Sequence, residues 1–172
     1  MDSLILIRPS EALIPEIEDF RNEHIQAGEK HIHGSAGLMH YDQIDEWIKY
    51  EKRIRRDVPE GLVPTDTYFL YDTRRSRILG TTQIRHYLNE GLTIRGGHIG
   101  YGLRPSERGK GFGKKMLALA LKKAKELGLN KVLVTCDKDN IASAKTIIAN
   151  GGVLENELVY EGVPIQRYWI QL

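Results

Sequence analysis

The stretch His98–Leu121, HIGYGLRPSERGKGFGKKMLALAL, decides the fold of this chain of 172 residues. It is typical of a short strand, a tight glycine-rich turn and the start of an amphipathic helix. Glycines and cations alternate through the turn, as Arg108, Gly109, Lys110, Gly111, Gly113 and Lys114. Unhindered amide groups at the positive end of a helix dipole attract phosphate. The stretch therefore predicts a phosphate-binding turn.

The overall composition points away from nucleic acid as a partner. Hydrophobic residues make up 41% of the chain and charged residues 28%, which is ordinary for a globular domain. Lysine and arginine number 25 against 23 aspartates and glutamates, an excess too small for a nucleic-acid-binding surface. The sequence has no internal repeat, low-complexity tract or linker-like composition shift. We therefore expect one domain over residues 1–172.

Cys136 is the only cysteine, so a disulfide framework is excluded and a reducing compartment, the cytoplasm, is expected. The histidine-rich segment 28–40 lacks the cysteine and carboxylate spacing of a metal site, and we predict no metal. No stretch approaches the roughly 20 apolar residues that span a bilayer. The first ten residues also lack the basic region of a signal peptide. These features predict no membrane partner.

Hydrophobic periodicity predicts the element order β-α-α-β-β-β-α-β-α-β-β. Strands are expected near residues 4–7, 67–71, 78–86, 98–103, 132–136, 153–160 and 165–170. Helices are expected to begin near Ser10, near Asp42 and after the glycine turn, with a short fourth helix over residues 141–149. The predicted fold is mixed α/β (α+β), with a mixed, mostly antiparallel central sheet of about seven strands and helices on both faces.

Two common phosphate-binding motifs do not fit the turn. A nucleotide P-loop requires G-x-x-x-x-G-K-[ST], but Gly113-Lys114 is followed by Lys115, and Arg108 stands at the position of the first glycine. A dinucleotide fingerprint requires G-x-G-x-x-G after the first strand. Here Lys114 occupies the position of its third glycine, and three predicted strands precede the turn.

The turn instead resembles the coenzyme A motif [QR]-x-x-G-x-[GA] of the GNAT superfamily of N-acetyltransferases, matched by Arg108–Gly113. A second family motif, Asn-x-x-[SA] after a buried strand, is matched by Asn140–Ser143 following Val132–Cys136, and its helix ends at Gly151. The element order of the whole chain also resembles the GNAT-like fold. Within the superfamily, the chain looks most like predicted bacterial acetyltransferases of unassigned substrate.

The resemblance implies that acetyl-CoA is the co-substrate. In the family, the strand corresponding to His98–Leu103 splays from its neighbour, so that its backbone binds the acetyl group and pantetheine. Carried over by position, the Tyr101 amide would face the acetyl oxygen. The residues that the resemblance implies for coenzyme A binding are Leu103, Arg104, Arg108, Gly109, Lys110, Gly111, Phe112, Gly113, Lys114, Asn140 and Ser143.

The resemblance leaves the acid and base less certain. Many relatives carry a tyrosine seven residues after the helix asparagine, but this position is Ile147 here, and Ser143 becomes the candidate acid. Relatives often place a glutamate near Gly97, and its absence leaves the base open. His98 is the first candidate, because histidine titrates near neutral pH. Two spare candidates are Asp137 and Tyr168.

Together these features predict an acetyl-CoA-dependent N-acetyltransferase. It would move the acetyl group directly from the thioester to a primary amine of a small molecule, peptide or protein. The alternative is a GNAT-fold sensor that binds coenzyme A without turnover, because the family's tyrosine and glutamate are missing. The fold also implies that segment 28–40 contacts the acceptor, and the C-terminal strands could pair across a homodimer.

Overall fold

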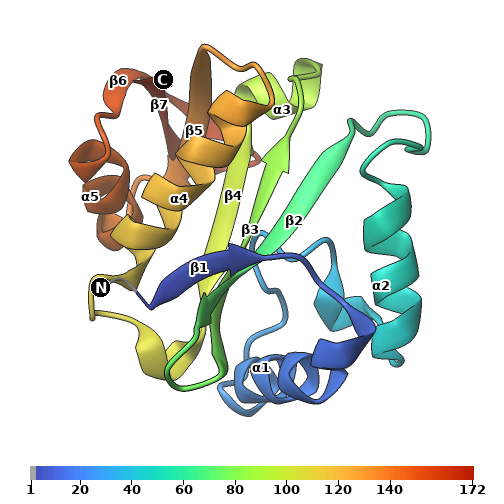
Figure 1. Cartoon of the computed structure of the whole chain (residues 1–172). Coiled ribbons are helices and arrows are strands. Elements are labelled where there is room, and N and C mark those ends of the chain that lie inside the picture. Colours follow the sequence, from blue (N-terminus) through green and yellow to red (C-terminus); the bar gives the residue numbers. More distant parts are fainter. Residues whose placement is uncertain (1–2) are drawn as a thin grey trace.

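The computed structural model describes residues 3–172, so Met1 and Asp2 of the predicted domain lie outside it. The chain runs through β1 (Leu4–Ile7), α1 (Ile14–Gln26), α2 (Ile44–Arg53), β2 (Thr65–Asp72), β3 (Arg77–Arg85), α3 (Glu90–Ile94), β4 (Ile99–Leu103), α4 (Phe112–Glu126), β5 (Lys131–Asp137), α5 (Ile141–Ala149), β6 (Val153–Tyr160) and β7 (Val163–Gln171), as Figure 1 shows. This is the predicted order with one additional helix, α3. No helix of the described part is long and apolar enough to cross a membrane.

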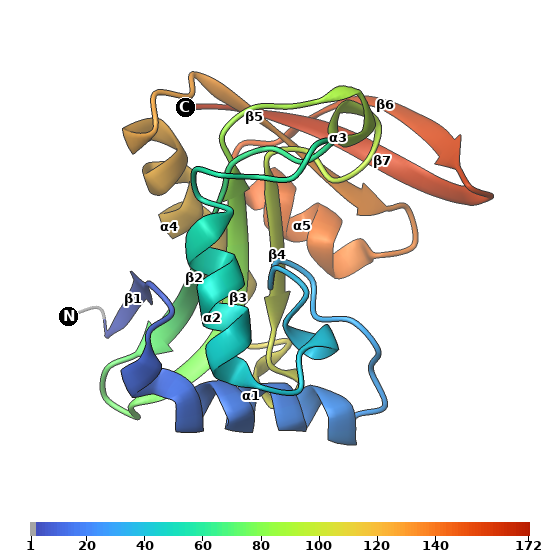
Figure 2. The same ribbon diagram turned by 90° about the vertical axis from the view of Figure 1, so that its right-hand side faces the viewer.

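The strands form two antiparallel sheets, ordered β1-β2-β3-β4 and β5-β7-β6. The predicted mixed α/β fold is confirmed, but its seven strands are divided between two sheets. The second sheet crosses one end of the first (Figure 2). The N–H of His98 donates to the carbonyl of Leu133 at 2.8 Å, where β4 approaches β5. Within residues 3–172 no other backbone hydrogen bond joins these two strands, so they part beyond this point.

Helices cover both faces of the first sheet (Figure 1). On one face, α1 and α2 bury Phe20 and Trp47 against Phe69 of β2. On the other face, α4 buries Leu117 against Ile84 of β3. The buried residues of α4 recur at helical spacing, which explains why this segment forms an amphipathic helix beside the sheet.

Helix starts differ from the sequence prediction by a few residues. A 3₁₀ turn occupies Glu11–Leu13, and α1 begins at Ile14, where Pro15 is accepted in the first helical turn. Helix α2 begins at Ile44, two residues after the predicted start. The unpredicted helix α3 is only five residues long, and its N-cap Asn89 accepts a hydrogen bond from the N–H of Leu92 at 2.9 Å.

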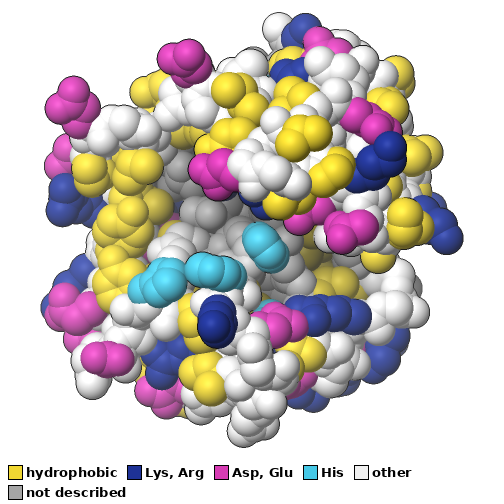
Figure 3. Space-filling view, turned by 180° about the vertical axis from the view of Figure 1, so that it is seen from behind, with side chains coloured by type: hydrophobic (Ala, Val, Ile, Leu, Met, Phe, Trp, Pro, Cys, Tyr) yellow, Lys and Arg dark blue, Asp and Glu magenta, His cyan; other side chains and the backbone are white. Residues whose placement is uncertain are grey.

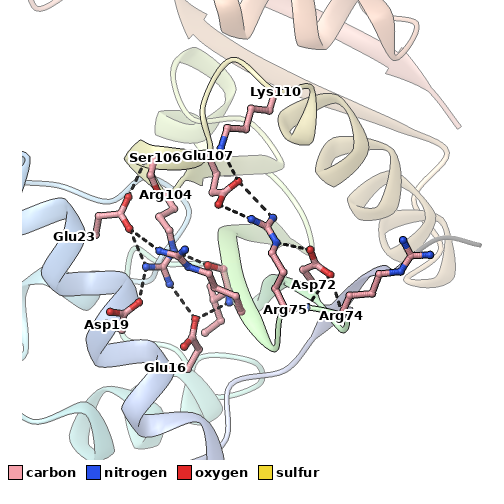
Figure 4. Close-up of polar contacts among 12 residues, drawn as sticks. Glu16, Asp19, Glu23, Asp72, Arg74, Arg75, Arg104, Ser106, Glu107 and Lys110 are labelled. Carbon is pink, nitrogen blue, oxygen red and sulfur yellow. Dashed lines mark hydrogen bonds and ion pairs between the residues drawn. The ribbon is translucent and has the colours of Figure 1, made fainter.

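Arg104 lies between the end of β4 and the glycine turn. It is fully buried, with 0% of its surface exposed. Figure 4 shows its guanidinium between three carboxylates of α1. Nη1 donates to Asp19 at 2.6 Å and to Glu23 at 2.9 Å, and Nη2 donates to Glu16 at 3.0 Å. Its Nε donates to the carbonyl of Ile78 at 2.7 Å. Arg104 therefore joins α1 to the sheet.

Candidate active site

A cavity of about 850 Å³ lies where β4 and β5 part. It is bordered by the β4 backbone, the glycine turn, the start of α5 and the histidine-rich segment 28–40. Figure 3 shows a hollow on this side of the molecule, with histidine side chains gathered along its edge. The sequence-predicted residues that line the cavity are Tyr101, Leu103, Arg108, Gly109, Gly111, Gly113, Lys114, Asn140 and Ser143.

The glycine turn presents bare backbone to this cavity. Gly109 and Gly111 adopt φ values of +74° and +85°, in the left-handed region that favours glycine. Gly111 is the N-cap of α4, and no side chain caps the helix there. The first amides of α4 therefore keep their donors for a ligand. A Cβ on Gly113 would lie 3.6 Å from atoms of Leu103 and Thr146, so this glycine keeps the groove between β4 and α5 open.

Arg108 lies beside the turn, but its guanidinium is paired within the protein. Nη1 and Nη2 donate to the two carboxylate oxygens of Glu29, at 2.5 and 3.1 Å. Glu29 also contacts Nδ1 of His24 at 2.8 Å. The hydrogen bond from Arg108 lowers the pKa of Glu29 to about 2. This pair links segment 28–40 to the glycine turn across the cavity.

Strand β4 exposes backbone amides on its open edge. The backbone groups of His98 and Arg104 are hydrogen-bonded to β3 at the two ends of β4, with distances of 2.7 and 2.8 Å. In an antiparallel pair, alternate residues direct their N–H and C=O groups to the partner strand. Because His98 and Arg104 both bond to β3, the odd-numbered residues between them direct their backbone groups away from β3. The amides of Tyr101 and Leu103 therefore point toward the cavity that both residues line.

The Tyr101 phenol meets Ser143 inside the cavity, with their oxygen atoms 2.7 Å apart. Burial raises the pKa of Tyr101 to about 12, so the phenol stays protonated at neutral pH. The N–H of Ser143 donates to Oδ1 of Asn140 at 3.1 Å, which makes Asn140 the N-cap of α5. From the sequence only the backbone amide of Tyr101 was expected at the site, because no local pattern indicates a contact between residues 42 positions apart.

Several predicted residues are not brought to the cavity. Arg104 was predicted to bind coenzyme A, but it is buried among the α1 carboxylates and does not line the cavity. Lys110 pairs with Glu107 at 3.4 Å, and Phe112 packs beside the buried Leu70–Leu79–Met116 cluster. None of these three residues is among those that line the cavity.

His98, the predicted base, does not line the cavity either. Its ring is 6% exposed, and Nδ1 accepts a hydrogen bond from the N–H of Leu133 at 2.9 Å. Burial, together with the charge of Arg85, lowers the pKa of His98 to about 4. The ring therefore holds β4 and β5 together and is not positioned to take a proton from a bound amine.

We expect His98 to make folding sensitive to pH. Its pKa falls from 6.5 to about 4, so below pH 6.5 the unfolded chain takes up a proton that the folded chain does not. The free energy of unfolding should therefore fall as the pH is lowered from 6.5 toward 4. Urea unfolding at pH 5 and pH 7 should show a smaller difference for His98→Gln than for the unmodified chain. Equal differences would contradict this assignment.

Of the two spare candidates for the base, Asp137 and Tyr168, only one lies at the cavity. Asp137 lines the cavity and pairs with Arg95 at 3.2 Å. Tyr168 is buried and its hydroxyl donates to Gln166 at 2.9 Å, away from the cavity. His31 and His33 line the cavity and are exposed. The half-buried Arg85 and Arg95 also line it, and no sequence motif pointed to either residue. Within residues 3–172 no three His, Cys, Asp or Glu side chains form a group that could hold a metal ion.

Comparison with solved structures shows the same fold in several acetyltransferases. A ribosomal-protein-S5-alanine acetyltransferase from Vibrio fischeri is 15% identical, with a TM-score of 0.74 over 99% of this chain and 94% of that one. A putative acetyltransferase, yncA, from Salmonella typhimurium, solved with its cofactor acetyl-CoA, is 14% identical, with a TM-score of 0.65 over 99% and 95%. A spermidine N-acetyltransferase SpeG chimera from Vibrio cholerae and hSSAT is 18% identical, with a TM-score of 0.67 over 99% and 96%.

Sequence comparison gives the family directly. None of the curated proteins matches this sequence. The family model of the acetyltransferase (GNAT) domain matches residues 4–153, which include the glycine turn, the β4 edge and the whole of α5. The predicted resemblance is thereby confirmed, and this chain belongs to the GNAT acetyltransferase family.

Proposed function

We propose that this chain, as one domain, transfers the acetyl group of acetyl-CoA directly to a primary amine of a small molecule, peptide or protein. The observation that carries the proposal is the cavity between β4 and β5. It joins a glycine-rich helix start, the open amide edge of β4 and the Tyr101–Ser143 hydroxyl pair. Acyl transfer requires all three: a place for the donor's phosphates, a polarised carbonyl and a proton for the leaving thiolate.

The donor's pyrophosphate is assigned to the start of α4. The amides that follow Gly111 and the Lys114 side chain border the cavity there, and the helix dipole favours an anion. Arg108 would contribute only by exchanging Glu29 for a phosphate oxygen. The pantetheine arm would then follow the open edge of β4 past Leu103 and Asn140.

The transfer step uses the β4 edge and the hydroxyl pair. The Tyr101 N–H donates to the acetyl oxygen and stabilises the negative charge that forms when the amine nitrogen attacks the carbonyl carbon. When the carbon–sulfur bond breaks, Ser143 donates its proton to the thiolate, and the Tyr101 phenol resupplies the serine across the 2.7 Å contact. The phenolate that this leaves takes a proton from solvent water as the products depart, which restores the pair for the next turnover. A histidine of segment 28–40, His31 or His33, takes the proton that the amine loses, since both line the cavity.

We expect Ser143→Ala to lower kcat about tenfold and to change the KM for acetyl-CoA less than twofold. The loss is smaller than for most acid catalysts because a thiolate leaves readily without full protonation. Tyr101→Phe keeps the ring packed and should lower kcat similarly, with no further loss in the double variant. Steady-state kinetics test this, and Ser10→Ala serves as the control, because the Ser10 side chain makes no capping hydrogen bond. A rise in KM with unchanged kcat would make Ser143 a binding residue only.

One experiment separates the enzyme from the sensor that binds coenzyme A without turnover. Acetyl-CoA is incubated with the protein and a broad panel of primary amines, and free thiol is measured. Thiol release that depends on an amine supports the proposed transferase. Acetyl-CoA binding without thiol release for any amine supports the sensor.

The acceptor is the least constrained part of the proposal. The structural neighbours include a spermidine N-acetyltransferase chimera and a ribosomal-protein-S5-alanine acetyltransferase, so this fold accommodates both small amines and proteins. We propose a cytoplasmic enzyme, on the basis of the single Cys136. Pairing of the C-terminal strands in a homodimer stays a prediction.

A further inference from the structure

A second cavity, of about 430 Å³, adjoins the candidate active site and shares Arg85 and Arg95 with it. The end of α2, residues 58–65 and the start of α3 form its walls. Its apolar lining residues are Ile54, Val58, Leu62, Val63 and Leu92, with the rings of Tyr50 and Tyr160 beside them. The volume is in the range of small-molecule sites. An organic molecule held at the two arginines could therefore place an apolar group in this second cavity.

Arg85 carries a charge that the protein does not balance. Its Nη1 donates to the carbonyls of Gly96 and Gly97, at 3.1 and 3.0 Å. No carboxylate of the described chain lies within ion-pair distance of Arg85, in contrast to Arg104 and Arg108, which are both paired. Burial lowers the pKa of Arg85 from its ordinary value, with no opposing contribution from an acid. A partly buried guanidinium without a counter-charge is costly unless a ligand supplies one.

The only other charged residue of the described chain that lines the second cavity is also an arginine. Arg95 also lines it and has one partner, Asp137, at 3.2 Å. No aspartate or glutamate is among the residues lining the second cavity. An anionic group is therefore favoured there, whereas a polyamine, with several positive charges, would be repelled by both guanidinium groups.

Arg85 is close to the proposed point of acetyl transfer. A Cβ built on Gly100 would lie 3.7 Å from Nη2 of Arg85. Gly100 precedes Tyr101, whose amide faces the main cavity. A group bound to Arg85 is thus held one residue along β4 from the proposed acetyl oxygen site. This separation suits a molecule with its amine and its anionic group attached to the same carbon atom.

We propose that the acceptor is a small amino acid with an apolar side chain, whose carboxylate is bound by Arg85. This inference rests on the proposed transferase function and specifies its substrate class. The guanidinium fork of Arg85 offers paired donors to the carboxylate, while the second cavity encloses the apolar side chain. The α-amine then projects into the main cavity, toward the β4 edge.

The test compares ligands that differ only at the carboxylate. L-leucine, L-leucinamide and 3-methylbutylamine share one apolar group, and L-phenylalanine, its amide and 2-phenylethylamine share another. Each is titrated calorimetrically into the full-length protein, with and without saturating coenzyme A. We expect at least one acid to bind about tenfold or more tightly than its amide and its decarboxylated amine, a difference of about 1.4 kcal/mol. If neither acid binds more tightly than its amide, the proposal is overturned.

Variants of Arg85 identify the responsible group. In Arg85→Gln the acid and its amide should bind within twofold of each other, and Arg85→Lys should retain part of the preference because it keeps the charge but loses the fork. Lys122→Gln, at an exposed position of α4, should leave the preference unchanged. Retention of the full preference in Arg85→Gln would overturn the assignment to Arg85.

The same measurements separate this inference from the proposed function. Failure of acetyl-CoA to bind would contradict the transferase, while the acid-to-amide ratio without coenzyme A still reports on Arg85. Amine-dependent thiol release with equal rates for acid and amide would support the transferase and overturn the carboxylate site. An unchanged affinity of Arg85→Gln for acetyl-CoA, within twofold, confirms that the arginine acts on the acceptor and not on the donor.

Discussion

Replacement of Gly113 by valine is expected to weaken acetyl-CoA binding at least 100-fold while the protein stays folded. Gly113 lies in the first turn of α4, and its φ is not in the left-handed region, so a side chain is accepted by the backbone. That side chain would project between Leu103 and Thr146, into the groove proposed for the donor. A 100-fold loss corresponds to about 2.8 kcal/mol of binding free energy.

Isothermal titration and thermal unfolding measure both parts of this expectation. The matched control is Lys122→Val, which introduces the same β-branched residue at an exposed position of the same helix. Both variants should unfold near the temperature of the unmodified chain, and only Gly113→Val should lose acetyl-CoA binding. Full affinity in a folded Gly113→Val protein would remove the donor from this groove.

Replacement of Arg104 by methionine is expected to lower the free energy of unfolding by about 3 kcal/mol. Removal of Arg104 takes away the shared partner of Glu16, Asp19 and Glu23 and leaves three neighbouring carboxylates with less positive charge beside them. Burial acts to raise the pKa of Glu23, but hydrogen bonds from Ser106 and Arg104 hold it at about 2, so this carboxylate is ionised in the intact cluster. The cluster also fixes α1 to the end of β4 (Figure 4).

The control for this variant is Arg77→Met. Arg77 pairs with the same carboxylate, Glu23, at 3.2 Å, but its side chain is 37% exposed. Exposed ion pairs contribute at most about 1 kcal/mol, so urea unfolding should show a clearly smaller loss for Arg77→Met than for Arg104→Met. Equal losses would contradict a structural role specific to Arg104.

The local features of the site could be predicted from sequence because they depend on neighbouring residues. Alternating glycines before an amphipathic helix indicate a bare helix start, and this is what Gly109 and Gly111 form. The second family motif places Asn140 directly before the predicted helix over residues 141–149, and in the structure Asn140 is the N-cap of that helix. These patterns need no knowledge of which distant segments meet.

The features that were missed depend on contacts between distant segments. Arg104 adjoins the coenzyme A motif in sequence, but its carboxylate partners lie 81 to 88 positions earlier, on α1. The role of His98 is set by the strand it meets 35 positions later, which buries the ring and lowers its pKa. The division of seven strands into two sheets likewise follows from how β4 and β5 part, which periodicity does not encode.

Calorimetric titration of acetyl-CoA into the full-length protein tests the central claim most directly. We expect saturable binding with one site per chain, and no binding of ATP or NAD, since the glycine turn matches neither of their motifs. Titration of Gly113→Val under the same conditions should give no saturation. The absence of acetyl-CoA binding to the unmodified, folded protein at millimolar concentration would contradict the assignment of the cavity between β4 and β5 to the acetyl donor.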